Sequence, residues 1–89
     1  MPNESLDRAQ VQDDVIRIIA LTLQVGKESL SGDSAIGNVR SWDSLSNLRI
    51  LIEVEAYMNK KISIDDLVNV RSVSDWVAVC QDYSKRKQD

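Results

Sequence analysis

The sequence predicts an all-α fold, a small four-helix bundle with three main helices, one short helix and a long first loop. Apolar residues recur at spacings of three and four along three segments, which is the period of an amphipathic helix. All three glycines lie between the first two segments, and the one proline is Pro2. No segment shows the sustained alternation of apolar and polar residues that a half-buried strand requires. The 89 residues are expected to form a single domain with its core over about residues 6–84.

The first helix is expected over residues 6–23. Ser5 can cap its start, and Asp7 suits the positive first turn of a helix. The apolar face consists of Val11, Val15, Ile18 and Ile19, extended at the ends by Leu6 and Leu23. A loop is expected over residues 25–43, which hold the three glycines. So long a connection is uncommon in a small domain and needs a packing or functional reason.

A second helix is expected over residues 44–61, where neither glycine nor proline interrupts the chain. A short helix should follow at residues 63–67, and a last helix should begin at Ser72, where Ser-Val-Ser-Asp resembles a capping box. The last helix carries one apolar stripe: Val73, Trp76, Val77, Cys80 and Tyr83. The predicted core consists of Val15, Ile18, Leu45, Leu48, Ile52, Ile62, Leu67, Val73 and Trp76. The polar tail after residue 84 is expected to fray.

The composition excludes several classes of function. Histidine is absent, which removes the usual general base and the commonest metal ligand. A single cysteine allows no internal disulfide, and a net charge of −3 disfavours nucleic acid as a partner. No stretch approaches the roughly 18 apolar residues of a membrane helix, and the N-terminus does not resemble a secretion signal. We therefore expect a cytoplasmic module with no membrane contact, no catalytic residues and no metal site.

The most informative segment is Trp42-Asp43-Ser44-Leu45, where the long loop meets the second helix. A serine at a helix N-terminus lies beside free backbone amides and the positive end of the helix dipole, a favourable place for a phosphate ester. Leu45 is expected to turn inward while Ser44 stays exposed. In isolation, Asp-Ser-Leu is more simply interpreted as an ordinary helix cap.

In this context the chain resembles the acyl carrier protein family, from Val11 to about Tyr83. The resemblance rests on Asp43-Ser44-Leu45, which matches the family's attachment signature, on the long preceding loop and on the apolar helix that follows. The Lys-Ile dipeptide at residue 61, the short turn at 64–67 and the helix start at 72 then occur in the family's order and spacing.

The resemblance implies a function without catalysis by the chain itself. Members of this family carry 4′-phosphopantetheine on the serine, so Ser44 is the implied covalent attachment site and Asp43 the adjacent motif residue. The arm's thiol would hold acyl or aminoacyl groups as thioesters. The implied partners are a phosphopantetheinyl transferase, an acyl- or aminoacyl-loading enzyme, and a downstream transferase, synthase or dehydrogenase. The chain is expected to be a monomer and not an enzyme.

Two departures from the family pattern indicate a specialised pathway, such as polyketide, nonribosomal peptide or glyceryl and hydroxyacyl unit synthesis. Fatty-acid carriers have a glycine-containing lead-in before Asp-Ser-Leu, whereas this chain has Val39-Arg40-Ser41-Trp42. The Trp-Asp-Ser-Leu form is similar to freestanding carriers of such pathways. The family's second helix is usually acidic, whereas residues 43–61 carry three acidic and three basic side chains. Recognition by dedicated partners is therefore expected, with these residues as the candidate contacts: Trp42, Leu45, Asn47, Arg49 and Glu53, together with Ser46.

Several alternatives stay open. Asn47 and Arg49 are expected on the exposed side of the helix, where they either contact partners or simply face solvent. Trp42 contacts the arm or a partner, or packs over the loop, and packing is the favoured interpretation. Cys80 is expected to be a buried, inert thiol. The alternative functions are a carrier of fatty-acid synthesis, a carrier domain excised from a synthase, and a small helical protein–protein interaction domain.

Overall fold

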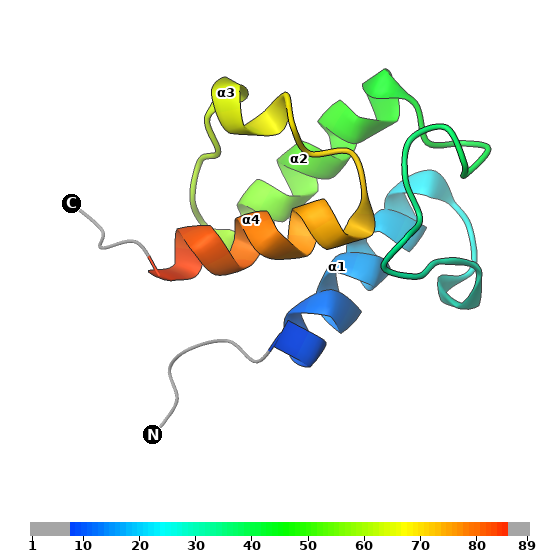
Figure 1. The fold of residues 1–89 in the computed structure, drawn as a ribbon, viewed down its shortest axis with the longest axis horizontal. Coiled ribbons are helices and arrows are strands. Elements are labelled where there is room, and N and C mark those ends of the chain that lie inside the picture. The colour runs from blue at the N-terminus through cyan, green and yellow to red at the C-terminus, as the bar shows by residue number, and fades with distance from the viewer. Residues whose placement is uncertain (1–7, 86–89) are drawn as a thin grey trace.

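Three main helices and one short helix make up the structure (Figure 1). The computed structural model describes residues 8–85, with α1 at Arg8–Leu23, a 3-10 turn η1 at Lys27–Ser29, α2 at Ser44–Met58, α3 at Ile64–Leu67 and α4 at Val73–Lys85. Only two isolated β-bridges occur in the described range, joining Ala35 with Ser72 and Ile36 with Val39. The predicted all-α fold with a long first loop is therefore confirmed.

Left-handed residues end the first two long helices. Gln24 follows α1 with φ 61°, and Asn59 follows α2 with φ 57°. Asparagine tolerates this conformation better than most residues, so α2 stops three residues before the predicted end. The predicted start of the first helix at residue 6, with Ser5 and Asp7, lies outside the described residues, as does the tail after residue 85.

Side chains cap the later helices, as their sequences indicate. Ser63 Oγ accepts a hydrogen bond from Asp66 N at 3.2 Å at the start of α3. Ser72 Oγ accepts from Asp75 N at 3.1 Å at the start of α4. The reciprocal bond of this capping box is displaced by one residue, because the Asp75 carboxylate accepts from Arg71 N at 3.0 Å.

The hydrophobic core lies where α1, α2 and α4 meet, with both tryptophans inside it. All five residues of the predicted α4 stripe are buried. Among the predicted core residues, Val15, Ile62, Val73 and Trp76 are buried, while Ile18 and Leu67 pack against the core half-buried. Burial of such side chains is the main source of stability in a domain of this size.

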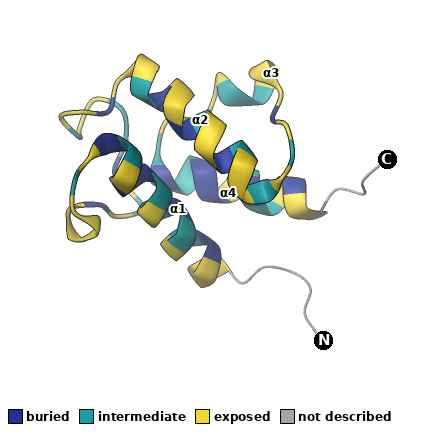
Figure 2. Cartoon of the chain, turned by 180° about the vertical axis from the view of Figure 1, so that it is seen from behind, coloured by how far each residue is buried: buried dark blue, intermediate teal, exposed yellow. Residues whose placement is uncertain are grey.

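The predicted inward face of α2 is wrong. Leu45, Leu48 and Ile52 are 60%, 46% and 62% exposed. The helix instead turns Asn47, Ile50 and Val54 inward, and Figure 2 shows its outer side as largely exposed. Both faces carry apolar residues at helical spacing, so periodicity does not distinguish them. The inward face is the one on which the Asn47 amide finds buried hydrogen-bond partners.

The long first loop is fastened to the beginning of α4. Ile36 N donates to Arg71 O at 2.9 Å, and Val73 N donates to Ser34 O at 2.9 Å. Gly32 O accepts from both the backbone nitrogen and the hydroxyl of Ser74, at 3.2 and 2.8 Å. These bonds satisfy loop backbone groups that would otherwise need water, and they supply the packing reason for the length of the connection.

Candidate functional site

Ser44 is exposed at the first position of α2, and another residue performs the capping. Asp43 is the N-cap: its backbone is extended, and its carboxylate accepts from Ser46 N at 2.9 Å. Within residues 8–85, the Ser44 hydroxyl makes no hydrogen bond to the protein. The local sequence therefore fixes the helix start through Asp43 and leaves the Ser44 oxygen available for reaction.

The Asp43 carboxylate is held in its charged form. The hydrogen bond from Ser46 N lowers the pKa of Asp43 below its usual value, and the nearby positive charge of Arg49 lowers it further. Because the folded-state pKa is depressed, the cap acts at neutral pH and is lost as the pH falls through that pKa. The fixed charge beside Ser44 is therefore negative under physiological conditions.

The chain that leads into the helix is also fixed. Ser46 Oγ donates to Ser41 O at 2.9 Å, and Ser41 Oγ donates to Leu23 O at 3.2 Å, which ties the segment to the end of α1. Trp42 N donates to Val39 O at 3.0 Å within the preceding turn. The position of Ser44 is thus determined from both sides of the helix start.

A buried asparagine lies one helical turn after Ser44. Asn47 Oδ1 accepts from the indole nitrogens of Trp42 and Trp76, at 3.0 and 3.1 Å, and Asn47 Nδ2 donates to Val70 O at 2.9 Å. The Asn47 amide on α2 thus connects Trp42 in the loop, Val70 in the link before α4 and Trp76 in α4. Such a network is stable in a low-dielectric interior only when every member is paired, as it is here.

Two expected partner contacts are therefore corrected. The Asn47 side chain was expected on the exposed side, but it is buried because its amide pairs with three groups of the core. Trp42 is only 2% exposed and belongs to the core, so the favoured interpretation of this residue, packing, is confirmed, and the partner contact is wrong. Leu45, Arg49 and Glu53 are exposed on α2.

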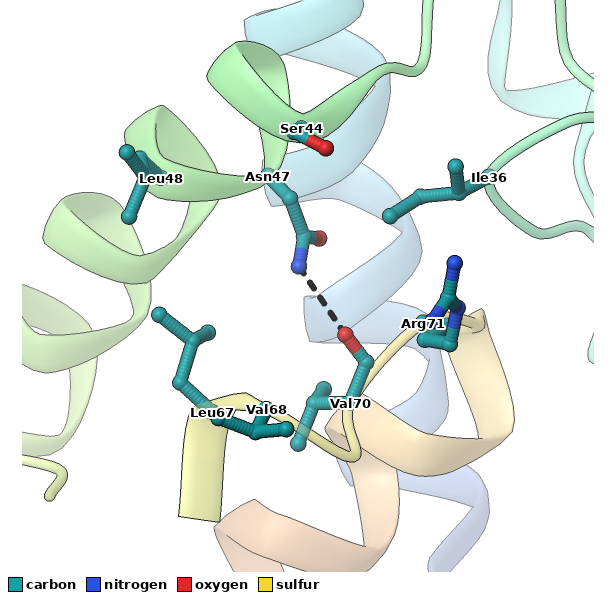
Figure 3. Close-up of a pocket in the computed structure, with 8 residues that line it drawn as sticks. All are labelled: Ile36, Ser44, Asn47, Leu48, Leu67, Val68, Val70 and Arg71. Carbon is teal, nitrogen blue, oxygen red and sulfur yellow. Dashed lines mark hydrogen bonds between the residues drawn. The ribbon is translucent and has the colours of Figure 1, made fainter. Parts of the chain in front are cut away.

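A pocket opens beside Ser44 between α2 and the segment that links α3 to α4 (Figure 3). Its volume is about 270 Å³, and its walls are formed by Ile36, Ser44, Asn47, Leu48, Leu67, Val68, Val70 and Arg71. Figure 3 shows the hydrogen bond from Asn47 on α2 to Val70 on the link between α3 and α4. The buried network therefore also holds two walls of the pocket together.

Apolar side chains are exposed on both sides of the pocket. Leu45, Leu48 and Ile52 lie along α2, while Ile64 and Val68 lie on and just after α3, at 65% and 66% exposure. Five of the seven large exposed hydrophobic residues in the described range belong to this group. We call these five residues the apolar rim. Exposed apolar clusters of this kind mark surfaces that other molecules cover.

The remaining candidates are structural. Cys80 is fully buried, and burial raises the pKa of its thiol to about 12, with a smaller contribution from the Asp14 carboxylate. A thiol in that state is a poor nucleophile. Over the described range, no group of three potential metal ligands forms, and no helix is long and apolar enough to cross a membrane.

Sequence reasoning located Ser44 and Asp43 but missed the residues that face them across the pocket. Ile36, Val70 and Arg71 belong to no periodic pattern, and they meet Ser44 only through the loop-to-α4 hydrogen bonds. The sequence signal for the hydrogen-bond network was the presence of two tryptophans and of Asn47, whose amide oxygen accepts from both indole nitrogens. No family model and no curated protein matches the chain significantly. The functional argument therefore rests on the site itself.

Proposed function

We propose that this chain is a carrier protein, in which the Ser44 hydroxyl is the attachment point of a 4′-phosphopantetheine arm. The observation that carries the proposal is an exposed serine hydroxyl, without a hydrogen bond in the described structure, on the first turn of α2. Because Asp43 already caps the helix, an ester on Ser44 removes no bond of the fold. Free amides and the helix dipole at this end favour the negative charge of a phosphodiester.

The attachment step balances without a catalytic group on this chain. The Ser44 oxygen attacks the phosphorus of coenzyme A that bears pantetheine, a serine–phosphorus bond forms, and the pyrophosphate bond breaks. The leaving group is adenosine 3′,5′-bisphosphate, and the hydroxyl proton passes to a base of the transferase. The sulfur that later carries the cargo belongs to the cofactor, which accords with a chain that has no histidine and only a buried cysteine.

The proposed setting is a specialised biosynthetic pathway in the cytoplasm, with acyl or aminoacyl units as cargo. The near-neutral charge of residues 43–61 and the apolar rim support dedicated partners over a general acidic recognition surface. A loading enzyme and a downstream transferase, synthase or dehydrogenase would approach over this side, because Ser44 lines the same pocket as Leu48 and Val68 of the rim.

The test is an intact-mass measurement after incubation with coenzyme A and a broad-specificity transferase. Wild type should gain one phosphopantetheinyl unit, and Ser44→Ala should gain none. Ser29→Ala is the control, since Ser29 is exposed outside the pocket and its loss should leave attachment intact. Ser44→Ala should change the free energy of unfolding by less than about 0.5 kcal/mol, because Asp43 supplies the cap. An unmodified wild type, or a modified Ser44→Ala, would refute the proposal.

The apolar rim also favours a second candidate, a helical protein–protein interaction domain in which Asp43 is only a cap. That function needs the rim but not the Ser44 hydroxyl. The same mass measurement separates the two, because an interaction domain gains no phosphopantetheine in any variant.

A further inference from the structure

One charged residue lines the pocket beside Ser44. Of its eight lining residues, five are apolar, two are uncharged and polar, and the last is Arg71. Figure 3 shows the Arg71 side chain on the wall opposite α2, next to Ile36. Across residues 8–85, its guanidinium makes no hydrogen bond or ion pair. A cation with five donors thus borders an apolar cavity with no anion to match it.

The backbone of Arg71 is fixed although its guanidinium is free. Arg71 N donates to the Asp75 carboxylate at 3.0 Å, and Arg71 O accepts from Ile36 N at 2.9 Å. The preceding carbonyl, Val70 O, accepts from Asn47 Nδ2 at 2.9 Å. Three bonds therefore set where the side chain starts, and only the side chain has to order when a ligand arrives. Binding therefore orders one side chain and leaves the backbone as it is.

Resting on the proposed function, we infer that Arg71 is the anion-binding residue of this pocket and pairs with an anionic group attached through Ser44. Guanidinium binds phosphate and carboxylate in the same two-donor geometry, so the anion is the phosphodiester of the arm or a carboxylate on the cargo. The apolar walls would cover the hydrocarbon next to that anion. Arg71 here is a positioning residue that directs the arm into the pocket.

The volume of the pocket agrees with a short, compact group. A cavity of about 150 Å³ already holds a benzene molecule, so about 270 Å³ accommodates a branched group somewhat larger than benzene. The other two arginines near Ser44 in the sequence, Arg40 and Arg49, do not line the pocket. They supply matched controls that remove the same charge outside it.

The experiment follows the Arg71 Nε–Hε signal by NMR in four states of the full chain. These are the apo protein and the Ser44-modified protein with a free thiol, an acetyl thioester and a succinyl thioester. The signal is assigned by its loss in Arg71→Gln, and melting temperatures verify that this exposed substitution leaves the fold intact. Arg49→Gln provides the control, and the response at Arg71 should persist in it.

The states separate the sources of the anion. A shift of the Arg71 signal in the free-thiol state identifies the phosphodiester, whereas a shift only with the succinyl group identifies a cargo carboxylate. Either result supports the inference. In Arg71→Lys, the NMR signals of Ile36 and Val70 should keep part of the shift that attachment causes in the wild type. If Ser44 accepts the arm but the Arg71 signal is the same in all four states, the inference is overturned and the carrier function stands. If Ser44 accepts no arm, both fail.

Discussion

Both faces of helix α2 carry apolar residues, but one face is buried and the other is exposed. The inward face presents Asn47, Ile50 and Val54 to the core, and the outward face presents Leu45, Leu48 and Ile52 to solvent. The outward face offers three large apolar side chains beside the exposed Arg49 and Glu53, whereas the inward face offers two beside Asn47. The helix nevertheless buries the face that includes an asparagine.

The difference teaches that a single polar group can decide how a helix is rotated. Buried as it is, the Asn47 amide pairs with two indole nitrogens and a carbonyl, so both tryptophans are satisfied by one oxygen. Rotating α2 to bury Leu48 would leave those donors unpaired, at a cost of about 1–3 kcal/mol each. Of the apolar residues left outside, Leu48 then lines the pocket beside Ser44.

The largest expected effect comes from a matched pair of isoleucines on the two faces. Ile50→Ala should lower the free energy of unfolding by about 2–5 kcal/mol, because Ile50 is fully buried and its loss leaves a cavity. Ile52→Ala should change it by less than about 0.5 kcal/mol, because that side chain is 62% exposed. Urea unfolding measures both. Equal losses would mean that α2 is rotated differently in solution.

Replacing the buried amide should have the next largest effect. Asn47→Leu removes the partners of the Trp42 and Trp76 indole nitrogens, which should lower the free energy of unfolding by about 2–3 kcal/mol. The control is Asn69→Leu at an exposed asparagine, with an expected change of less than about 0.5 kcal/mol. Unfolding followed by tryptophan fluorescence reports on both. A stabilised Asn47→Leu protein would show that apolar burial alone orients the helix.

Much of the architecture was predictable because it is local. Helical periodicity and the capping residues Asp43, Ser63 and Ser72 depend on neighbours a few positions away, and so did the exposed Ser44 at a helix start. The rotation of α2 was not predictable by the same means. It depends on Trp76, which lies 29 residues beyond Asn47 in sequence, and periodicity carries no information about such a pairing.

The wall of the pocket was unpredictable for a related reason. Ile36 and Arg71 are placed by backbone hydrogen bonds between the first loop and the start of α4, and backbone groups leave no trace in residue type. The long loop was recognised as needing a reason, but the partner that fastens it was not. Sequence reasoning therefore located the exposed Ser44 at the helix start and missed the residues around it.

A pH-dependent effect on the free energy of unfolding is expected from Cys80, which is buried in the core. Burial raises the pKa of the Cys80 thiol to about 12, whereas an unfolded cysteine ionises near pH 8.5. The buried neutral thiol therefore makes its full contribution to stability at pH values below the pKa of the unfolded cysteine. Between about pH 9 and 12 the free energy of unfolding should fall, because the thiol ionises in the unfolded chain but stays neutral in the folded one.

Unfolding across this pH range, with Cys80→Ala as the reference, isolates the contribution of the thiol. The folded protein should also resist iodoacetamide at pH 8 and react once unfolded in guanidinium. Rapid alkylation of the folded protein would contradict the buried, neutral state of Cys80.

The smallest effect is expected on the outward face, in the salt dependence of cargo loading. Residues 43–61 are neutral overall, so long-range steering is weak, and the loading rate should change less than about threefold between low and high salt. Arg49→Glu should slow loading through short-range contacts while attachment at Ser44 persists. A steep salt dependence in wild type, or an unchanged rate for Arg49→Glu, would place recognition elsewhere.

The order in which the pocket residues occur along the chain has a consequence for folding during protein synthesis. The pocket beside Ser44 is completed by residues that come much later in the chain: Leu67, Val68, Val70 and Arg71. Trp76 comes later still and completes the hydrogen-bond network around Asn47. On the ribosome, Ser44 emerges well before these residues, and the loop lacks its hydrogen-bond partners at the start of α4 until that segment has left the exit tunnel. A nascent or truncated chain thus displays the serine without the pocket. Formation of the pocket is thereby coupled to synthesis of the chain through the start of α4.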